Sequence, residues 1–223
     1  MKKILLLGIT LIMLMSGCSA NINDAYKMVE DINNIANTEA FTDYYIKGTN
    51  KTSNTTLNYE LKKDNANYYL KLDNNHYYLI ENNNSYHIYE SLNGVKSHYK
   101  KEESIGNLLE EYASRMSINT NMNNMHYNIA KHIENLLGYC SENNAICNVS
   151  KDLFNKKSIE VVQETNISKR VSCYTTSKGK ITSISSEYKE ETMYFNTIIE
   201  IDYSSQNLNN FNKNEYKIVN KNS

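Results

Sequence analysis

The first regular hydrophobic pattern of the chain covers residues 23–37. Its apolar residues recur every three or four positions, the spacing of one face of an α-helix; they are Ala25, Tyr26, Met28, Val29, Ile32, Ile35 and Ala36. The polar face carries more acid than base, with Asp24, Glu30 and Asp31 against Lys27. Because that charge has the wrong sign for an anionic bilayer, the pattern favours a helix packed on the domain over a membrane-lying one.

From residue 41 to residue 101 the period changes to two, which predicts strands with one apolar face. The alternating positions are Tyr44/Ile46, Leu57/Tyr59/Leu61, Tyr68/Leu70/Leu72, Tyr77/Leu79, Tyr86/Ile88/Leu92 and Val95/Tyr99. Residue pairs that tolerate the positive φ of tight hairpin turns separate these runs; they are Asn65-Ala66, Asn74-Asn75, Asn83-Asn84 and Asn93-Gly94. The pattern predicts a six-stranded antiparallel meander.

These turns also predict the register of the hairpins. Each turn places apolar residues opposite one another: Leu61 and Leu70, Leu72 and Tyr77, Leu70 and Leu79, Leu79 and Ile88, Leu92 and Val95, Ile88 and Tyr99. A slip of one residue would move every side chain to the other face. The agreement among the hairpins therefore predicts one apolar face, on whose parity Glu90 and Ser97 also fall.

Helical patterns follow the meander. One covers residues 105–116 with Ser104 as its cap, and its apolar stripe is Ile105, Leu108, Leu109, Tyr112 and Met116. A second covers 122–137 and ends near Gly138, and its apolar stripe is Met122, Met125, Ile129, Ile133, Leu136 and Leu137. We expect a polar loop over residues 140–147 and a short helical turn from Ser150 to Phe154.

The last third of the chain returns to strand patterns, over residues 159–164, 169–176, 180–189 and 192–203, with a turn at Lys178-Gly179. The final strand is the clearest, because its apolar residues share one parity; they are Met193, Phe195, Ile199, Ile201 and Tyr203. Residues 205–223 are rich in Asn and Lys and predict a polar tail that frays, with one short strand at 216–219.

The N-terminus has the pattern of an export signal. Lys2 and Lys3 precede an apolar run over residues 4–15, and Ser16-Gly17-Cys18 follows. The position of Cys18 after two small residues resembles the lipobox of bacterial lipoproteins. The resemblance implies that residues 1–17 are a signal peptide, that Cys18 is acylated, and that residues 18–23 tether the protein to the extracytoplasmic face of the cell membrane.

Composition limits the classes of partner. The chain has 223 residues, with 24 basic against 25 acidic side chains. Cleavage before Cys18 removes two of the lysines and leaves 22 basic side chains and a formal charge of −3. A near-neutral protein lacks the basic footprint of a nucleic-acid-binding protein. No linker interrupts residues 24–204, which we expect to form one domain followed by the polar tail 205–223.

The histidines do not predict a metal site. His76, His87 and His98 lie on successive strands, but the register places them opposite Ser91, Ile80 and Tyr89, so the three are staggered. His126 and His132 are six positions apart and do not share a helical face.

The cysteines leave one pairing open. With Cys18 acylated, Cys140 and Cys147 flank a short extracytoplasmic loop and can form a disulfide, while Cys173 shares a strand face with Val171 and is expected to be a buried thiol. The number of cysteines is odd after acylation, and the sequence does not decide their pairing.

Neither a phosphate-binding loop nor a nucleophile elbow occurs in the sequence. Glu110-Glu111 and Glu190-Glu191 are adjacent in the chain and so point to different faces, unlike a catalytic carboxylate pair. We therefore expect no enzymatic activity and no cofactor. The outward tyrosines of the meander are either ordinary strand residues or an aromatic surface for a partner; they are Tyr45, Tyr69, Tyr78 and Tyr89, and the inward ones are Tyr59, Tyr68, Tyr77 and Tyr99.

The order of the elements resembles the lipid-carrier fold of the LolA, LppX and LprG type, shared by the N-terminal domain of RseB regulators. The closing run from Lys178-Gly179 to Tyr203 is similar to the C-terminal hairpin of that family. The resemblance implies an α+β fold: a strongly curved antiparallel sheet of about ten strands, an incomplete barrel, with an N-terminal helix and two plugging helices.

Such a fold implies an apolar cavity between the sheet and the helices. Its lining would be Leu70, Leu79, Ile88, Tyr99, Leu108, Leu109, Met122, Met125, Ile129 and Ile133. The first hypothesis is a lipoprotein that binds a lipid-like or lipopeptide ligand there. The alternative is an envelope sensor with a filled core, which binds an envelope protein through its outer aromatic face.

Overall fold

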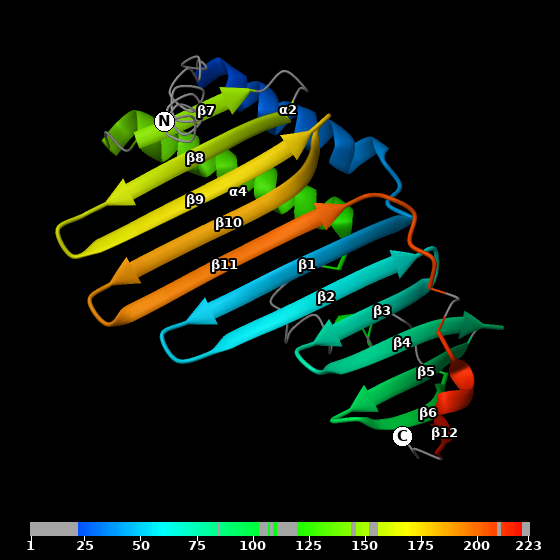
Figure 1. Ribbon diagram of the computed structural model, residues 1–223. Coiled ribbons are helices and arrows are strands. Elements are labelled where there is room, and N and C mark those ends of the chain that lie inside the picture. The colour runs from blue at the N-terminus through cyan, green and yellow to red at the C-terminus, as the bar shows by residue number, and fades with distance from the viewer. Residues whose placement is uncertain are drawn as a thin grey trace, which may run out of the picture.

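The computed structural model describes residues 22–83, 85–102, 107, 109–110, 120–143, 146–151, 156–208 and 211–219, with the backbone alone at 141–143 and 146. Within them, two α-helices cover one face of a twelve-stranded sheet that does not close (Figure 1). The fold is therefore α+β with an open, curved sheet. The predicted signal peptide, Cys18 and most of the helix expected at 105–116, Leu108 included, lie outside the described residues.

The helices are α2 (Ile22–Thr38) and α4 (Met122–Asn143). The strands are β1 (Asp43–Thr52), β2 (Thr56–Asp64), β3 (Asn67–Leu72), β4 (Asn75–Asn82), β5 (Ser85–Leu92), β6 (Val95–Lys101), β7 (Ile146–Lys151), β8 (Lys156–Glu164), β9 (Ser168–Ser177), β10 (Lys180–Glu190), β11 (Met193–Asp202) and β12 (Lys217–Ile218). Their order across the sheet is β12-β6-β5-β4-β3-β2-β1-β11-β10-β9-β8-β7.

The predicted meander is confirmed as β1 to β6, and three of its four predicted turns have the expected register. The exception is the β3–β4 hairpin, which turns at Asp73-Asn74, so Leu70 pairs with Tyr77 and Tyr68 with Leu79. Two hydrogen bonds hold the turn there: the Asp73 N–H donates to the Asn58 carbonyl, and the Asn58 N–H donates to the Asp73 carboxylate. Moving the turn by one position shifts the pairing by two residues, so the apolar face is preserved.

The second half of the sheet contains a strand that the sequence did not predict. Helix α4 continues past Gly138 to Asn143, and β7 begins at Ile146, where we expected a polar loop and a helical turn. Strand β7 pairs with β8, and with β12 it brings the number of strands from about ten to twelve. The two halves join through antiparallel pairing of β1 with β11.

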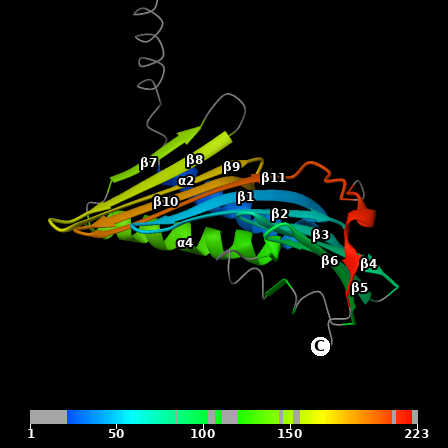
Figure 2. The same cartoon turned by 60° about the horizontal axis from the view of Figure 1, so that its bottom comes forward.

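Both helices lie on the same side of the sheet, which we call the inner face (Figure 2). As expected, α2 packs on the domain through its apolar stripe, and Ala25, Met28 and Ile32 are 0 % exposed. No helix in the described part of the chain is long and apolar enough to span a membrane.

A buried histidine attaches α4 to the sheet. His126 is 0 % exposed, and its Nε2 accepts a hydrogen bond from the backbone N–H of Ile181 in β10 at 3.2 Å. Its Nδ1 must then carry the proton, which it donates to the Met122 carbonyl at 2.7 Å. The Tyr203 hydroxyl donates to the Ile181 carbonyl at 2.6 Å. The imidazole thus joins helix to strand in its neutral form.

The C-terminal residues pack against the outer face of the meander, where we had expected a fraying tail. Leu208 is 5 % exposed, and the Phe211 ring stacks on Tyr78 with centroids 4.0 Å apart. A 3-10 turn at Lys213–Glu215 leads into β12, which pairs in parallel with β6 and lies within the strand predicted at 216–219. Aromatic stacking and edge pairing therefore order this polar segment.

Candidate functional site

The predicted cavity residues come together in one apolar core. Leu70, Leu79, Ile88 and Ile133 are 0 % exposed, and Ile129 packs against them partly buried. The others are 2–7 % exposed: Met122, Met125, Leu109 and Tyr99. Three pockets that the described residues form lie elsewhere, and none of these nine residues lines them. The residues predicted to line a cavity thus pack with one another.

The polar residues predicted on the inner face are accommodated by hydrogen bonds. The Glu90 carboxylate is 4 % exposed and accepts from the Ser97 hydroxyl at 2.7 Å and from the Tyr99 hydroxyl at 3.3 Å. Partners of this kind offset the cost of burying a carboxylate. Glu90 therefore ties β5 to β6 from inside the core.

Tyr59 differs from the other inner-face tyrosines. It is 1 % exposed, and its hydroxyl has no hydrogen-bond partner among the residues that the structure describes. Burial raises the pKa of Tyr59 to about 12, so the hydroxyl stays protonated and keeps a donor to offer. An unpaired buried hydroxyl costs roughly 1–3 kcal/mol. Among the buried side chains of the described residues, this hydroxyl is a polar group that a ligand could satisfy.

The cover over the inner face ends part-way along β11. Ile199 and Ile201 are 7 % and 6 % exposed, whereas Phe195 and Met193 on the same face are 49 % and 48 % exposed. Such alternating positions point to one side of a strand. The buried core therefore continues, toward the β10–β11 turn, as an exposed apolar surface.

Aromatic and cationic groups extend this surface onto neighbouring strands. Phe195 lies opposite Tyr188 of β10, and their ring centroids are 6.3 Å apart. The Arg170 guanidinium of β9 lies over the Tyr188 ring at 5.2 Å, and the Tyr188 hydroxyl donates to the Glu190 carboxylate. We call Arg170, Tyr188, Met193 and Phe195 the open inner surface. The parity of the last strand predicted its face, but nothing in the sequence showed that it lacks cover.

The outward tyrosines of the meander are partly covered by the chain itself. Tyr78 stacks on Phe211, and Tyr89, 8 % exposed, contacts Phe211 and Tyr216 edge-on. Tyr69 is within 4.8 Å of Tyr78, centroid to centroid. A pocket of about 250 Å³ remains between this face and Leu208 and Phe211. The aromatic surface expected for a partner is thus in part an internal interface.

The histidine register is confirmed, but two of the three side chains are in contact. His76, His87 and His98 lie opposite Ser91, Ile80 and Tyr89, as expected. His87 and His98 are nevertheless diagonal neighbours on one face, and His87 Nδ1 is 2.9 Å from His98 Nε2. Burial, then the neighbouring His87, lowers the pKa of His98. Among the described residues, no group of three or more metal-ligating side chains occurs.

A basic pocket of about 440 Å³ lies between α2 and the ends of β7–β10. Its lining includes four lysines, Lys27, Lys151, Lys157 and Lys178, and one acid, Asp31. These lysines are up to 151 positions apart in the chain, so no basic run announced the pocket. A second polar pocket of about 370 Å³ lies on the outer face of β1–β3, where Lys71 pairs with Glu60 at 3.3 Å.

A disulfide joins Cys140 near the end of α4 to Cys147 in β7, with their Cα atoms 6.4 Å apart. It links the helix to the edge strand next to the basic pocket. Cys173 is half-buried on the outer face, and burial, followed by the nearby Glu160, raises the pKa of its thiol. A raised pKa makes this thiol a poor nucleophile.

No protein-family model and no curated protein matches the chain. Among solved structures it is similar to a DUF1329 family protein from Desulfovibrio piger, with 9 % sequence identity and a TM-score of 0.21. The alignment covers 81 % of this chain and 90 % of that one. A similarity at this level carries no argument about activity or ligand.

Proposed function

We propose that this protein is a membrane-anchored extracytoplasmic lipoprotein that binds a hydrophobic or amphipathic ligand, a lipid or lipopeptide, against the inner face of its sheet. The observation that carries the proposal is the end of the helix cover over β11, where Phe195 and Met193 are about half exposed. Exposed apolar surface that continues from a core is a common feature of ligand-binding grooves.

The chemistry of this face suits an amphipathic molecule. An apolar chain would lie along Met193 and Phe195, while Arg170, stacked on Tyr188, offers a cation at the rim. Farther inside, the Tyr59 hydroxyl offers an unused donor. Apolar contact with a few polar groups at defined places is the usual composition of a ligand site.

The alternative, a protein partner on the outer aromatic face, has less support. Two of its four tyrosines, Tyr78 and Tyr89, already contact Phe211 of the same chain. A partner would have to displace this segment and forgo the contacts it makes. Contact with the exposed Met193 and Phe195 of the inner face needs no such rearrangement.

Native mass spectrometry of residues 21–223 purified from the host, followed by organic extraction, tests the proposal. We expect a co-purifying mass of lipid size, released by solvent. Phe195→Asp should abolish retention of that mass, because it places a carboxylate where the apolar chain lies. Ile198→Asp is the matched control, since Ile198 is 46 % exposed on the outer face of the same strand and should leave retention unchanged.

Equal loss of ligand in both variants, with both still folded by thermal melting, would contradict an inner-face site. A protein without ligand, which also takes up no added lipid, would refute the proposal as a whole.

The anchor is tested separately in cells. Cys18→Ala should remove acylation and release the protein from membranes, since the acyl chains supply the attachment. Retention of the variant in salt-washed membranes would show that Cys18 is not the anchor.

A further inference from the structure

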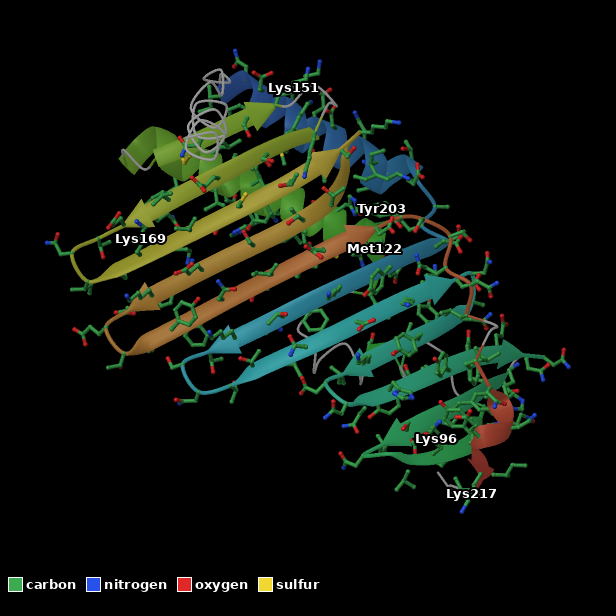
Figure 3. The ribbon with its side chains drawn as sticks, viewed as in Figure 1. Lys96, Met122, Lys151, Lys169, Tyr203 and Lys217 are labelled. Atoms are coloured by element: carbon green, nitrogen blue, oxygen red, sulfur yellow. A yellow bond between two sulfur atoms is a disulfide. The ribbon has the colours of Figure 1, made fainter. Side chains whose placement is uncertain are left out.

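The basic pocket is built from segments that the fold brings together. Helix α2 contributes Lys27 and Asp31, the ends of β7 and β8 contribute Lys151 and Lys157, and the β9–β10 turn contributes Lys178. Figure 3 shows Lys151 at the end of β7 beside α2, and Lys169 far away at the opposite end of β9. The pocket is separate from the open inner surface.

The β9–β10 turn is pressed against the helix and closes one side of the pocket. Gly179 has φ +79°, and a Cβ at this position would lie 2.8 Å from the Ile35 side chain and 2.9 Å from the Asp31 carbonyl. Only a glycine lets the turn approach this closely. Lys178 is thereby held next to α2, and Thr176, 2 % exposed, lines the same pocket.

Within the described part of the chain, one lysine of the four forms an ion pair. Lys157 Nζ is 2.5 Å from Asp31 Oδ2, and the Lys157 side chain is 14 % exposed. Asp31 is the one acidic side chain among the described residues of the lining, so three positive charges have no acidic partner among those residues. Lysines gathered in a concave site focus their field and concentrate anions there. Four ammonium groups around about 440 Å³ suit an anion with several acceptor oxygens.

The pocket lies close to the expected membrane anchor. Cys18 precedes the first residue of α2, Ile22, by four positions, a span of at most about 14 Å when extended. Lys27 is five residues further, about 8 Å along the helix. Phosphates of membrane lipids are therefore within reach of the pocket, although the protein as a whole is slightly acidic.

We propose that Lys27, Lys151, Lys157 and Lys178 form a binding site for a phosphate group, and that its source is the headgroup of an anionic phospholipid. Binding there would hold the α2 edge of the domain toward the membrane. The other end of the sheet, with the β10–β11 turn and the open inner surface, would then point away from the bilayer. The lipid source rests on the proposed anchor at Cys18, but the site is independent of the proposed inner-face ligand, so either binding proposal can fail alone.

Lysine acetylation of the acylated full-length mature protein in nanodiscs tests the site. Acetylation rates at each lysine are measured by peptide mass spectrometry in discs of phosphatidylcholine alone and in discs containing phosphatidylglycerol. We expect phosphatidylglycerol to slow acetylation of Lys27, Lys151 and Lys178 several-fold. Lys51 and Lys189, exposed near the β1–β2 and β10–β11 turns, should react equally in both discs. Equal rates at the pocket lysines in both discs, or slowing at all lysines alike, would overturn the proposal.

A pair of double variants separates the site from overall charge. Lys151→Gln/Lys178→Gln should abolish the slowing at Lys27, whereas Lys51→Gln/Lys189→Gln removes the same charge and should preserve it. Thermal melting shows that both variants are folded. If the slowing persists in the first variant, the pocket is not the site.

Inorganic phosphate added to phosphatidylcholine discs distinguishes the two sources of the phosphate group. We expect it to leave the pocket lysines as reactive as before. Slowing by inorganic phosphate equal to that by phosphatidylglycerol would overturn the lipid source and assign the pocket to a soluble phosphate.

Discussion

The ring of Tyr59 lies over the backbone of Gly48, its partner on the neighbouring strand. A Cβ at position 48 would be 2.2 Å from Tyr59 Cζ and 2.3 Å from its hydroxyl oxygen. Glycine weakens a strand interior, so its place in β1 is explained by this close approach. The contact lies where the meander joins the second half of the sheet, since Gly48 also pairs with Ile199 of β11.

Gly48→Ala should lower the free energy of unfolding by about 1–3 kcal/mol, the usual cost of overpacking a core. Urea denaturation measures the change. Combining it with Tyr59→Leu removes the ring that the new methyl group meets, so the double variant should be more stable than the sum of the single effects predicts. Additive effects would show that the two residues are not in contact.

Tyr59→Phe should leave the protein as stable as before or raise its free energy of unfolding by about 1 kcal/mol, because it removes an unpaired buried hydroxyl. Tyr44→Phe is the matched control. The Tyr44 hydroxyl donates to the Thr120 carbonyl at 2.7 Å, so its loss should cost about 1 kcal/mol. Equal losses in the two variants would mean that Tyr59 also has a partner.

Leu79→Asp should prevent folding or lower the melting temperature strongly, because Leu79 is 0 % exposed at the centre of the apolar face and the new charge would be unpaired. Asn82→Asp introduces a carboxyl at an exposed position of the same strand and should change stability little. Circular dichroism melts compare the two variants. An unchanged melting temperature for Leu79→Asp would contradict the face assignment.

Stability should fall as the pH drops below about 6.5, the pKa of a histidine in an unfolded chain. Burial, aided by the nearby Lys180, holds the pKa of His126 below that value in the folded protein. Above pH 6.5 both states are neutral at this site. Below it the unfolded state binds the proton first, and the free energy of unfolding decreases as the pH falls.

Comparison with His126→Gln isolates this contribution, because burial also lowers the pKa of the more exposed His76, His98 and His132. Urea denaturation between about pH 8 and pH 5 covers the range in which histidines titrate. The free energy of unfolding should decline less steeply over this range in the variant. Identical declines would show that His126 does not titrate with folding.

The sequence predicted which residues face inward but not which of them remain exposed. Residues such as Leu70, Leu79 and Ile88 were predicted to face inward and do. These residues pack with one another, and the exposed apolar surface lies at Phe195 instead. This difference depends on where the helices stop covering the sheet. The strand pattern of Phe195 is the same as that of buried Ile199, so alternation alone cannot distinguish a covered position from an open one.

The positions of the polar C-terminal segment and of the pocket lysines could not be predicted from local sequence patterns either. Residues 205–223 have no periodic pattern, yet Phe211 packs on Tyr78 because the outer face of β4 offers an aromatic platform. The pocket lysines come from α2, β7, β8 and a turn. Neither arrangement produces a recognisable pattern in one continuous stretch of the sequence.

The sequence by itself determined a helix over residues 23–37, the meander, the faces of its strands and the register at three of the four predicted turns. These are local properties, because side-chain alternation and positive φ depend on neighbouring residues alone. The tertiary structure decided the pairing of β1 with β11, the unpredicted strand β7, the pairing of the short strand β12 with β6, and the assembly of each candidate site. Those features join segments far apart in the chain, and they form only where packing and charge bring particular surfaces together.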